Sequence, residues 1–233
     1  SPYPVYPLGL SMVAAAVCDA GHEVALFDFL QAGQSLEALT SRVRQWRPDV
    51  VGVSIRNIDN VNLIHEERYI DKAAEIVAAV RAVSEDAVVV SGGSAFSILP
   101  ERILAFIGAD YGVVGEGETV FQELLADIER GQAPPPGTIL RGGQRLEDGL
   151  IPSALYDGNL LASYLEGGSI ASVQTKRGCP LKCVYCSYPA LEGSRIRRRD
   201  PGRVVDDVET LRDQHNARFI FFTDSVFNDD AGN

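Results

Sequence analysis

The sequence predicts an α/β protein: a parallel sheet covered by helices, followed by a second α/β segment that carries a cysteine cluster. Three observations support this prediction. Helical and strand-like segments alternate through residues 8–130, the strands are short and continuously apolar, and polar or glycine-rich loops follow several of them. Alternating elements favour a parallel sheet, and continuously apolar strands are typical of a sheet that is buried on both faces.

The elements of the first segment are predicted from hydrophobic periodicity and from their flanking turn residues. They are helix 8–20, strand 23–29, helix 35–46, strand 50–54, helix 66–83, strand 87–91, helix 100–106, strand 111–114 and helix 119–130. Polar loops follow three of the strands: Ser54-Ile-Arg-Asn57, Ser91-Gly-Gly-Ser94 and Gly115-Glu-Gly-Glu118. The carboxyl ends of strands line the ligand crevice of open α/β sheets, so we expect these loops to meet there.

A linker is expected between the two segments, which gives domain boundaries of 1–131, 132–168 and 169–233. The run Gly131-Gln-Ala-Pro-Pro-Pro-Gly137 favours an extended and stiff conformation because of its three prolines. Within the linker, Ile139-Leu140 and Arg145-Leu146 flank a Gly-Gly pair. This pattern predicts a small hairpin.

The second segment reads as a strand, a loop, a helix and a second strand. Residues 169–175 form the first predicted strand, and Asp200-Pro201 begins a helix that extends as far as His215. The second strand is predicted at 218–222 and ends in a polar run that contains Asp224. We interpret Asp224 either as a contact for a cofactor or substrate, or as a solvated loop carboxylate.

Three thiols lie within eight residues, at Cys179, Cys183 and Cys186. Disulfide bonds would leave one of the three unpaired, and an acidic, cysteine-poor chain is typical of the reducing cytoplasm. A closed zinc site needs four ligands, and the other candidate ligands are distant in sequence: Cys18, His22, His65 and His215. Closely spaced thiolates favour an iron–sulfur cluster, with zinc and a core or redox role as alternatives.

The spacing C-x3-C-x2-C, with Tyr185 before the last cysteine, resembles the signature of radical S-adenosylmethionine (SAM) enzymes. The resemblance implies that Cys179, Cys183 and Cys186 hold a [4Fe–4S] cluster, that SAM binds its fourth iron and that Tyr185 lies near the adenine. It also implies an external electron donor of the flavodoxin or ferredoxin type. The strand, loop and helix described above would then begin a partial (β/α)6 barrel.

The first segment resembles the Rossmann-like (flavodoxin-like) cobalamin-binding domain of B12-dependent radical SAM enzymes. The matching phrases are Tyr6-Pro-Leu-Gly-Leu-Ser11, Ala20-Gly-His-Glu-Val24, Pro48-Asp-Val-Val-Gly-Val-Ser54, Gly92-Gly93 and Val114-Gly-Glu-Gly-Glu-Thr119. Cobalamin contacts are implied for Ser54, Gly92, Gly93, Gly115, Glu116, Gly117 and Glu118. No Asp-x-His-x-x-Gly motif is present, so no histidine ligand to cobalt is expected. The first strand of this domain is also expected to be absent.

The resemblance implies a cobalamin-dependent radical SAM enzyme that transfers a methyl group to an unactivated carbon of a small molecule. A radical SAM cyclase or rearrangement enzyme and a non-catalytic cobalamin- or nucleotide-binding module are the alternatives. Cys18 is expected to be a core thiol, and a single N-terminal cysteine disfavours a methylthiotransferase, which needs three for a second cluster. The chain is expected to be an N-terminal fragment that is inactive by itself.

Composition excludes two other classes of protein. The net charge of −11 disfavours a general nucleic-acid binder, because phosphate contacts need a basic surface. No apolar run reaches the roughly 20 residues of a membrane span. A cytoplasmic protein is expected because the chain is acidic and cysteine-poor and shows no signal peptide. One basic run, Arg195-Ile-Arg-Arg-Arg199, is interpreted as a solvated face, with contact to an anionic cofactor or barrel closure as alternatives.

Overall fold

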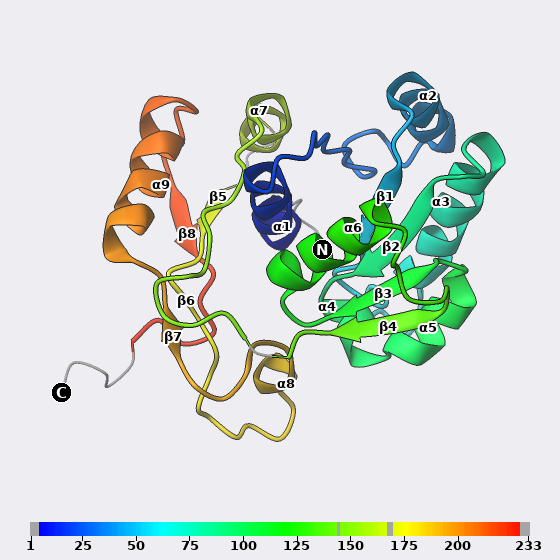
Figure 1. Ribbon diagram of the computed structural model, residues 1–233. Helices are drawn as coiled ribbons and strands as arrows, with labels where there is room; N and C mark the ends of the chain where they lie inside the picture. Colours follow the sequence, from blue (N-terminus) through cyan, green and yellow to red (C-terminus); the bar gives the residue numbers. More distant parts are fainter. Residues whose placement is uncertain (1–4, 144, 167–169, 229–233) are drawn as a thin grey trace. The chain divides into compact units, whose positions relative to one another are not determined.

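A computed structural model describes residues 5–143, 145–166 and 170–228 (Figure 1). Its packing divides into two compact units. The sheet unit is Phe27–Gly143, and the cysteine unit combines Ser1–Leu26 with Gln144–Asn233. The N-terminal segment therefore packs with the C-terminal part of the chain, whereas the expected boundaries group it with the sheet.

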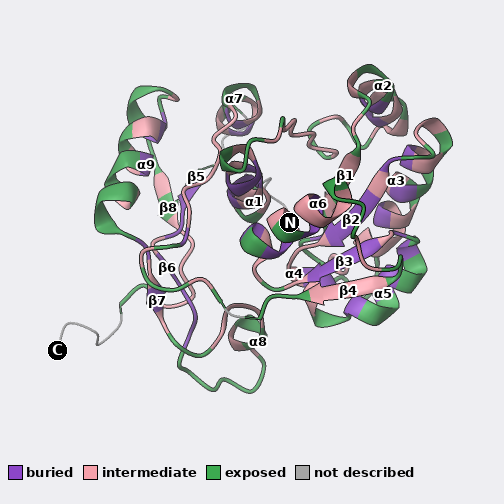
Figure 2. Ribbon diagram, in the orientation of Figure 1, coloured by how far each residue is buried: buried purple, intermediate pink, exposed green. Residues whose placement is uncertain are grey.

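A four-stranded parallel sheet forms the centre of the sheet unit, in the order β1-β2-β3-β4 (Figure 1). Its strands are β1 (Val50–Ser54), β2 (Val88–Gly92), β3 (Tyr111–Val114) and β4 (Thr138–Arg141). The buried residues of β2 and β3 stand out in Figure 2, whereas β4 is only partly buried. The predicted parallel α/β sheet is confirmed.

The helices of this unit cover both faces of the sheet. They are α2 (Leu36–Trp46), α3 (Tyr69–Val83), α4 (Ser94–Ile98), α5 (Pro100–Ile107) and α6 (Gly117–Glu129). Val89 packs in one apolar cluster with residues of α2–α5, and the next residue, Val90, packs in a second cluster with residues of α6. Successive strand residues point to opposite faces, so burial on both sides explains the continuous apolar runs.

Two predictions for the first segment and the linker are wrong. Residues 23–29, expected to form a strand, belong to none: the segment ends in a turn, where the Asp28 carbonyl group accepts from the Ala32 N–H and the Phe29 carbonyl group accepts from the Gln34 N–H. The expected hairpin within the linker is instead a single strand, β4, which pairs in parallel with β3 through Tyr111↔Thr138 and Val114↔Arg141. The stretch expected to be a linker therefore extends the sheet.

The cysteine unit has a parallel pair of strands joined through a helix. Its elements are α1 (Leu8–Asp19), α7 (Gly158–Glu166), β5 (Ala171–Val173), β6 (Lys176–Arg177), α8 (Tyr188–Glu192), β7 (Arg197–Arg198), α9 (Pro201–Asp213) and β8 (Ile220–Phe222). β5 pairs with β8 in parallel, and Asp200 caps α9 by accepting a hydrogen bond from the Arg203 backbone. The predicted strand–loop–helix–strand order is confirmed, although Ser169, at the start of the first predicted strand, lies outside the described residues.

Tyr6 ties the N-terminal segment into this unit. Its hydroxyl group donates a hydrogen bond to the Leu155 carbonyl group, and its ring lies 5.8 Å from the ring of Tyr164. The apolar core around it contains Leu161, Val173 and Leu211, which are fully buried. None of the helices described in either unit is long and apolar enough to cross a membrane.

Candidate functional site

The cysteine loop, residues 178–196, is closed at its base by the short antiparallel pair β6 and β7. The ladder joins Lys176 to Arg198 and Arg177 to Arg197. Inside it, Gly178 has a φ of +93°, and a Cβ atom there would lie 2.1 Å from the Arg195 carbonyl oxygen. Only glycine fits this position, because both the backbone conformation and the close approach exclude a side chain.

The three thiols share this loop but do not converge in the described structure. Cys179 is buried, Cys183 is exposed and Cys186 is half-buried, with a hydrogen bond from the Cys186 N–H to the Cys183 carbonyl group. Among the described residues, no three His, Cys, Asp or Glu side chains lie close enough to hold one metal ion. Three thiols without a fourth ligand fit an iron–sulfur cluster better than a closed zinc site.

Tyr185 lies at the tip of the same loop, where its side chain is 88% exposed. Its neighbour Val184 is fully exposed as well. The tip of the loop therefore contributes little to the apolar core. Packing constrains the base of the loop, but not its tip. The expected contact of Tyr185 with an adenine stays a prediction.

Asp224 joins the ends of the paired strands β5 and β8. Its carboxylate accepts hydrogen bonds from the Thr175 N–H at 2.7 Å, the Lys176 N–H at 3.2 Å and the Thr175 hydroxyl group. It is therefore not a solvated loop carboxylate. The chain itself engages both oxygens, and a role in binding a cofactor or substrate stays a prediction.

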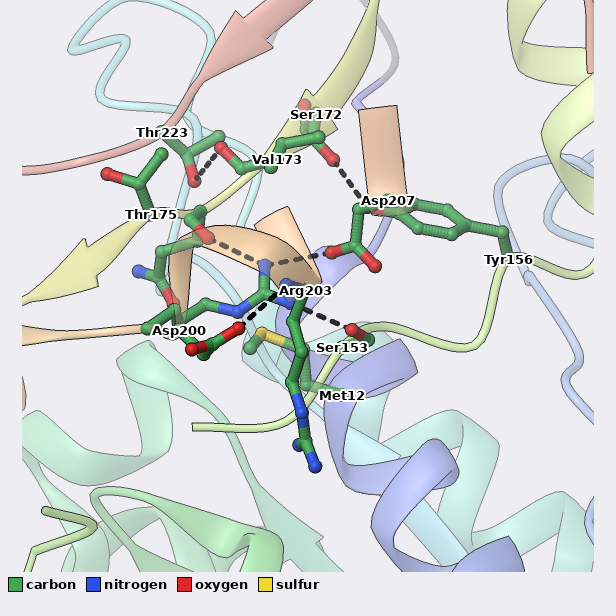
Figure 3. Close-up of polar contacts among 12 residues, drawn as sticks. Met12, Ser153, Tyr156, Ser172, Val173, Thr175, Asp200, Arg203, Asp207 and Thr223 are labelled. Carbon is green, nitrogen blue, oxygen red and sulfur yellow. Dashed lines mark hydrogen bonds and ion pairs between the residues drawn. The ribbon is translucent and has the colours of Figure 1, made fainter. Parts of the chain in front are cut away.

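The basic run after the cysteines is only partly solvated. Arg195 is exposed, whereas Arg197 and Arg199 are 2% and 4% exposed. The Arg199 guanidinium group forms a buried ion pair with Asp207 at 2.8 Å and donates to the Gln174 carbonyl group and the Ser153 hydroxyl group (Figure 3). The interpretation as a solvated face is wrong for these two residues, which hold the unit together.

Tyr156 is close enough to this ion pair for the charges of Asp207 and Arg199 to act on its phenol, and Figure 3 labels Tyr156 and Asp207. Its hydroxyl group donates to the Ser172 carbonyl group at 3.2 Å. Burial raises the pKa of Tyr156, and the negative charge of Asp207 raises it further. The phenol therefore keeps its proton and its role as a donor over the physiological pH range.

In the sheet unit, the loops at the carboxyl ends of β1, β2 and β3 meet as predicted. The Ser94 hydroxyl group donates to the Arg56 carbonyl group, at 2.7 Å. The hydroxyl group of Ser97 donates to the Gly93 carbonyl group and accepts from the Gly115 N–H, at 2.8 and 2.9 Å. Sequence reasoning missed Ser97 because a serine within a short helix carries no distinguishing signal.

The glycines of this edge have packing roles. Gly93 has a φ of +97°, and a Cβ atom there would lie 2.5 Å from the Ile55 carbonyl oxygen. A Cβ atom on Gly92 would lie 3.4 Å from the Val113 carbonyl oxygen. These two glycines let neighbouring strands and loops approach each other, so their presence is explained without a ligand.

A shallow pocket of about 180 Å³ opens at the end of β1. Ser54 lines it together with Val53, Arg56, Asn57, Tyr69 and other residues of α3. Three other predicted contact residues follow β3: Glu116 precedes α6, Gly117 begins this helix and Glu118 is buried in its first turn. Ser54, Gly92, Gly93 and Gly115 thus lie along one edge of the sheet, at the carboxyl ends of its strands.

Comparison with known families and proteins identifies relatives of the whole chain. The family model of the B12 binding domain matches residues 1–125. Tryptophan 2-C-methyltransferase from Streptomyces laurentii is 25% identical, and the match covers 97% of this chain and 47% of that enzyme. Hopanoid C-3 methylase from Methylococcus capsulatus is 26% identical, with 94% of this chain and 42% of the methylase covered. The chain spans about half the length of the relatives that it matches.

A solved structure shares the fold of almost the whole chain. The radical SAM methyltransferase TsrM from Kitasatospora setae, with tryptophan and a SAM analogue bound, superimposes with a TM-score of 0.81. It is 27% identical, and the match covers 97% of this chain and 46% of TsrM. A second structure of TsrM, which holds cobalamin and a [4Fe–4S] cluster, gives a TM-score of 0.79.

Proposed function

Since this chain belongs to the B12-binding domain family, we propose that it forms the cobalamin-binding part and the cluster-binding part of a radical SAM methyltransferase. The observation that carries the proposal is the cysteine loop between β5 and α9, which follows a B12-binding segment in the same chain. The similarity to TsrM over 97% of this chain supports the same assignment.

In this proposal, Cys179, Cys183 and Cys186 would hold a [4Fe–4S] cluster, beside which SAM would bind. The cluster, when bound, supplies the electron that cleaves SAM, and cobalamin supplies the methyl group. The residues of the chain itself position these groups. The ladder of β6 and β7 fixes the base of the loop, and Asp224 ties the end of β5 to β8.

The residues proposed to lie beside cobalamin, at the carboxyl edge of the sheet, are Ser54, Gly92, Gly93, Gly115 and the start of α6 with its cap, Glu116–Glu118. The methyl acceptor is proposed to be an unactivated carbon of a small molecule, and the electron donor a flavodoxin or ferredoxin. The relatives named above act on substrates as different as tryptophan and hopanoids, so the identity of the acceptor is not carried over.

The first test is iron and sulfide analysis of the chain after anaerobic reconstitution, with a visible absorption spectrum. The expected result is one [4Fe–4S] cluster per chain, which Cys183→Ala abolishes because only two thiolates remain. Cys18→Ala is the matched control and should keep the cluster, since Cys18 lies on α1. Unchanged iron content in Cys183→Ala would contradict the assignment of the loop.

The cobalamin half of the proposal is tested separately. The reconstituted protein is mixed with hydroxocobalamin and desalted, and the corrinoid absorption that stays with the protein is measured. Retained corrinoid supports a binding domain at the sheet edge. A cluster without corrinoid would remove cobalamin from the proposal, and corrinoid without a cluster would favour a non-catalytic binding module.

A further inference from the structure

Glu192, at the end of α8, contacts three separate segments of the cysteine unit. One carboxylate oxygen accepts a hydrogen bond from the Gln174 side-chain amide group at 3.1 Å. The other accepts from the Gly178 backbone N–H at 3.2 Å and from the Ser225 hydroxyl group at 3.0 Å. The end of β5, the start of the cysteine loop and the loop after β8 therefore meet at one side chain.

The Gly178 contact is the one that bears on the cluster, because Gly178 directly precedes Cys179. The next N–H group, that of Cys179, donates to the carbonyl group of Gly193 at 3.0 Å. Glu192 and Gly193, which are consecutive at the end of α8, thus accept hydrogen bonds from the N–H groups of Gly178 and Cys179. The Arg197 guanidinium group in turn donates to the Glu192 carbonyl group at 2.6 Å, which fixes this end of α8 on β7.

The chemistry of these contacts favours a carboxylate over any other side chain. All three partners are donors, and Gln174 uses its own side-chain oxygen to accept from Arg177 at 2.9 Å. Only an acceptor with two oxygens satisfies all of them, and hydrogen bonds to a charged acceptor are stronger than neutral ones.

We propose that Glu192 is a positioning residue for the iron–sulfur cluster. It holds Gly178 and Cys179 at the start of the loop and places a negative charge beside the first cluster ligand. This inference rests on the proposed function, because it assigns Glu192 a role toward the same cluster. It adds a residue outside the cysteine motif to the determinants of cluster binding.

The hydrogen bond from Gly178 to Glu192 is tested in the full chain without metal. The measurement is hydrogen–deuterium exchange of the peptide that covers residues 174–183. Glu192→Ala should speed exchange at Gly178 about tenfold, because the N–H group loses its acceptor and the loop base opens more often. Glu192→Gln should give a smaller change, since an amide oxygen still accepts from Gly178 and Ser225. Glu209→Ala, an exposed carboxylate on α9, is the matched control and should leave this peptide unchanged.

The role toward the cluster is tested in the reconstituted protein by the rate of iron loss to a chelator and by the cluster reduction potential. Glu192→Ala should lose iron several-fold faster than the wild-type protein. Glu192→Gln should retain iron nearly as well but shift the potential to a less negative value, because it removes a negative charge and keeps most of the hydrogen bonds. A role in folding alone would not shift the potential of the Gln variant.

The outcomes separate this inference from the proposed function. A wild-type chain that takes up no iron overturns the proposed function, and the inference with it. A loaded wild-type chain with unchanged exchange in Glu192→Ala overturns the inference alone. Faster exchange with unchanged iron loss and potential also overturns it, because Glu192 would then brace the loop without affecting the cluster.

Discussion

At the scale of single residues, Arg199 and Asp207 form a buried ion pair in the cysteine unit. Both side chains are almost fully buried, and the guanidinium group also donates to Gln174 and Ser153. Burying a charge is costly unless it is paired, so neither partner tolerates removal of the other. The basic run that contains Arg199 is thus partly a structural element.

The first prediction concerns this pair. Asp207→Ala should lower the free energy of unfolding by about 3 kcal/mol, because the Arg199 charge stays buried without its counter-ion. The double variant Arg199→Met with Asp207→Leu should cost less than Asp207→Ala alone, since it removes both charges together. Urea denaturation followed by circular dichroism measures both. A double variant less stable than Asp207→Ala would contradict the reasoning.

Cys18 provides a second prediction. Burial raises the pKa of its thiol group, and the neighbouring Asp19 carboxylate raises it further. The thiolate, which is the reactive form, is therefore scarcer at pH 8 than for an ordinary cysteine. In the variant with Cys179, Cys183 and Cys186 replaced by serine, iodoacetamide should label Cys18 more slowly than it labels glutathione at pH 8. Because a raised pKa keeps the thiol group protonated up to a higher pH, the labelling rate should still increase with pH above the usual cysteine pKa. A rate that levels off below the usual cysteine pKa would contradict the raised pKa of Cys18.

At the scale of elements, the glycine after β2 sets how closely two loops approach. Gly93→Ala should lower the free energy of unfolding by about 3 kcal/mol or more, because it combines a positive φ with a Cβ atom that would meet the Ile55 backbone. Gly108→Ala is the matched control, with a φ of +70° and no atom within 4 Å of the added Cβ. It should cost only about 1 kcal/mol. Thermal denaturation measures the loss of stability in each variant. Equal losses in Gly93→Ala and Gly108→Ala would mean that the contact with the Ile55 backbone adds no cost.

Some elements of this fold could be predicted from the sequence and others could not. The parallel sheet was predictable because both faces of β2 and β3 are buried, which leaves continuous runs such as Val88-Val89-Val90. The meeting of the loops after β1, β2 and β3 follows from parallel pairing alone. β4 was not predictable, because Thr138–Arg141 follows three prolines and is only partly buried. The residues around Arg199 were also hidden, since Ser153 lies 46 positions away from it in the sequence.

The candidate site was predictable to a similar extent. The three cysteines mark one loop by their spacing, yet Glu192 carries no motif, and its partners Gln174 and Ser225 lie on other segments. Asp224 was a candidate for cofactor or substrate contact, but its hydrogen bonds to Thr175 and Lys176 depend on the pairing of β5 with β8. Residue patterns in the sequence do not reveal contacts between segments that are far apart in the chain.

At the scale of the whole molecule, the two units have separate apolar cores, and the single tryptophan, Trp46, lies in α2 of the sheet unit. Its fluorescence therefore reports the unfolding of that unit. Asp207→Ala should shift the transition seen by circular dichroism to a lower temperature and leave the Trp46 transition in place, because the pair lies in the other core. Gly93→Ala should shift the Trp46 transition. Equal shifts of both signals in both variants would indicate a single cooperative unit instead.

The docking of Tyr6 and α1 with residues from the far end of the chain has a consequence for synthesis on the ribosome. Tyr6 and helix α1 are synthesised before the sheet unit, whereas Leu155 and Tyr164, which contact Tyr6, follow only after it. At typical translation speeds this interval lasts on the order of ten seconds. During that time Tyr6 lacks these two partners, so the sheet unit should fold before the N-terminal segment is anchored.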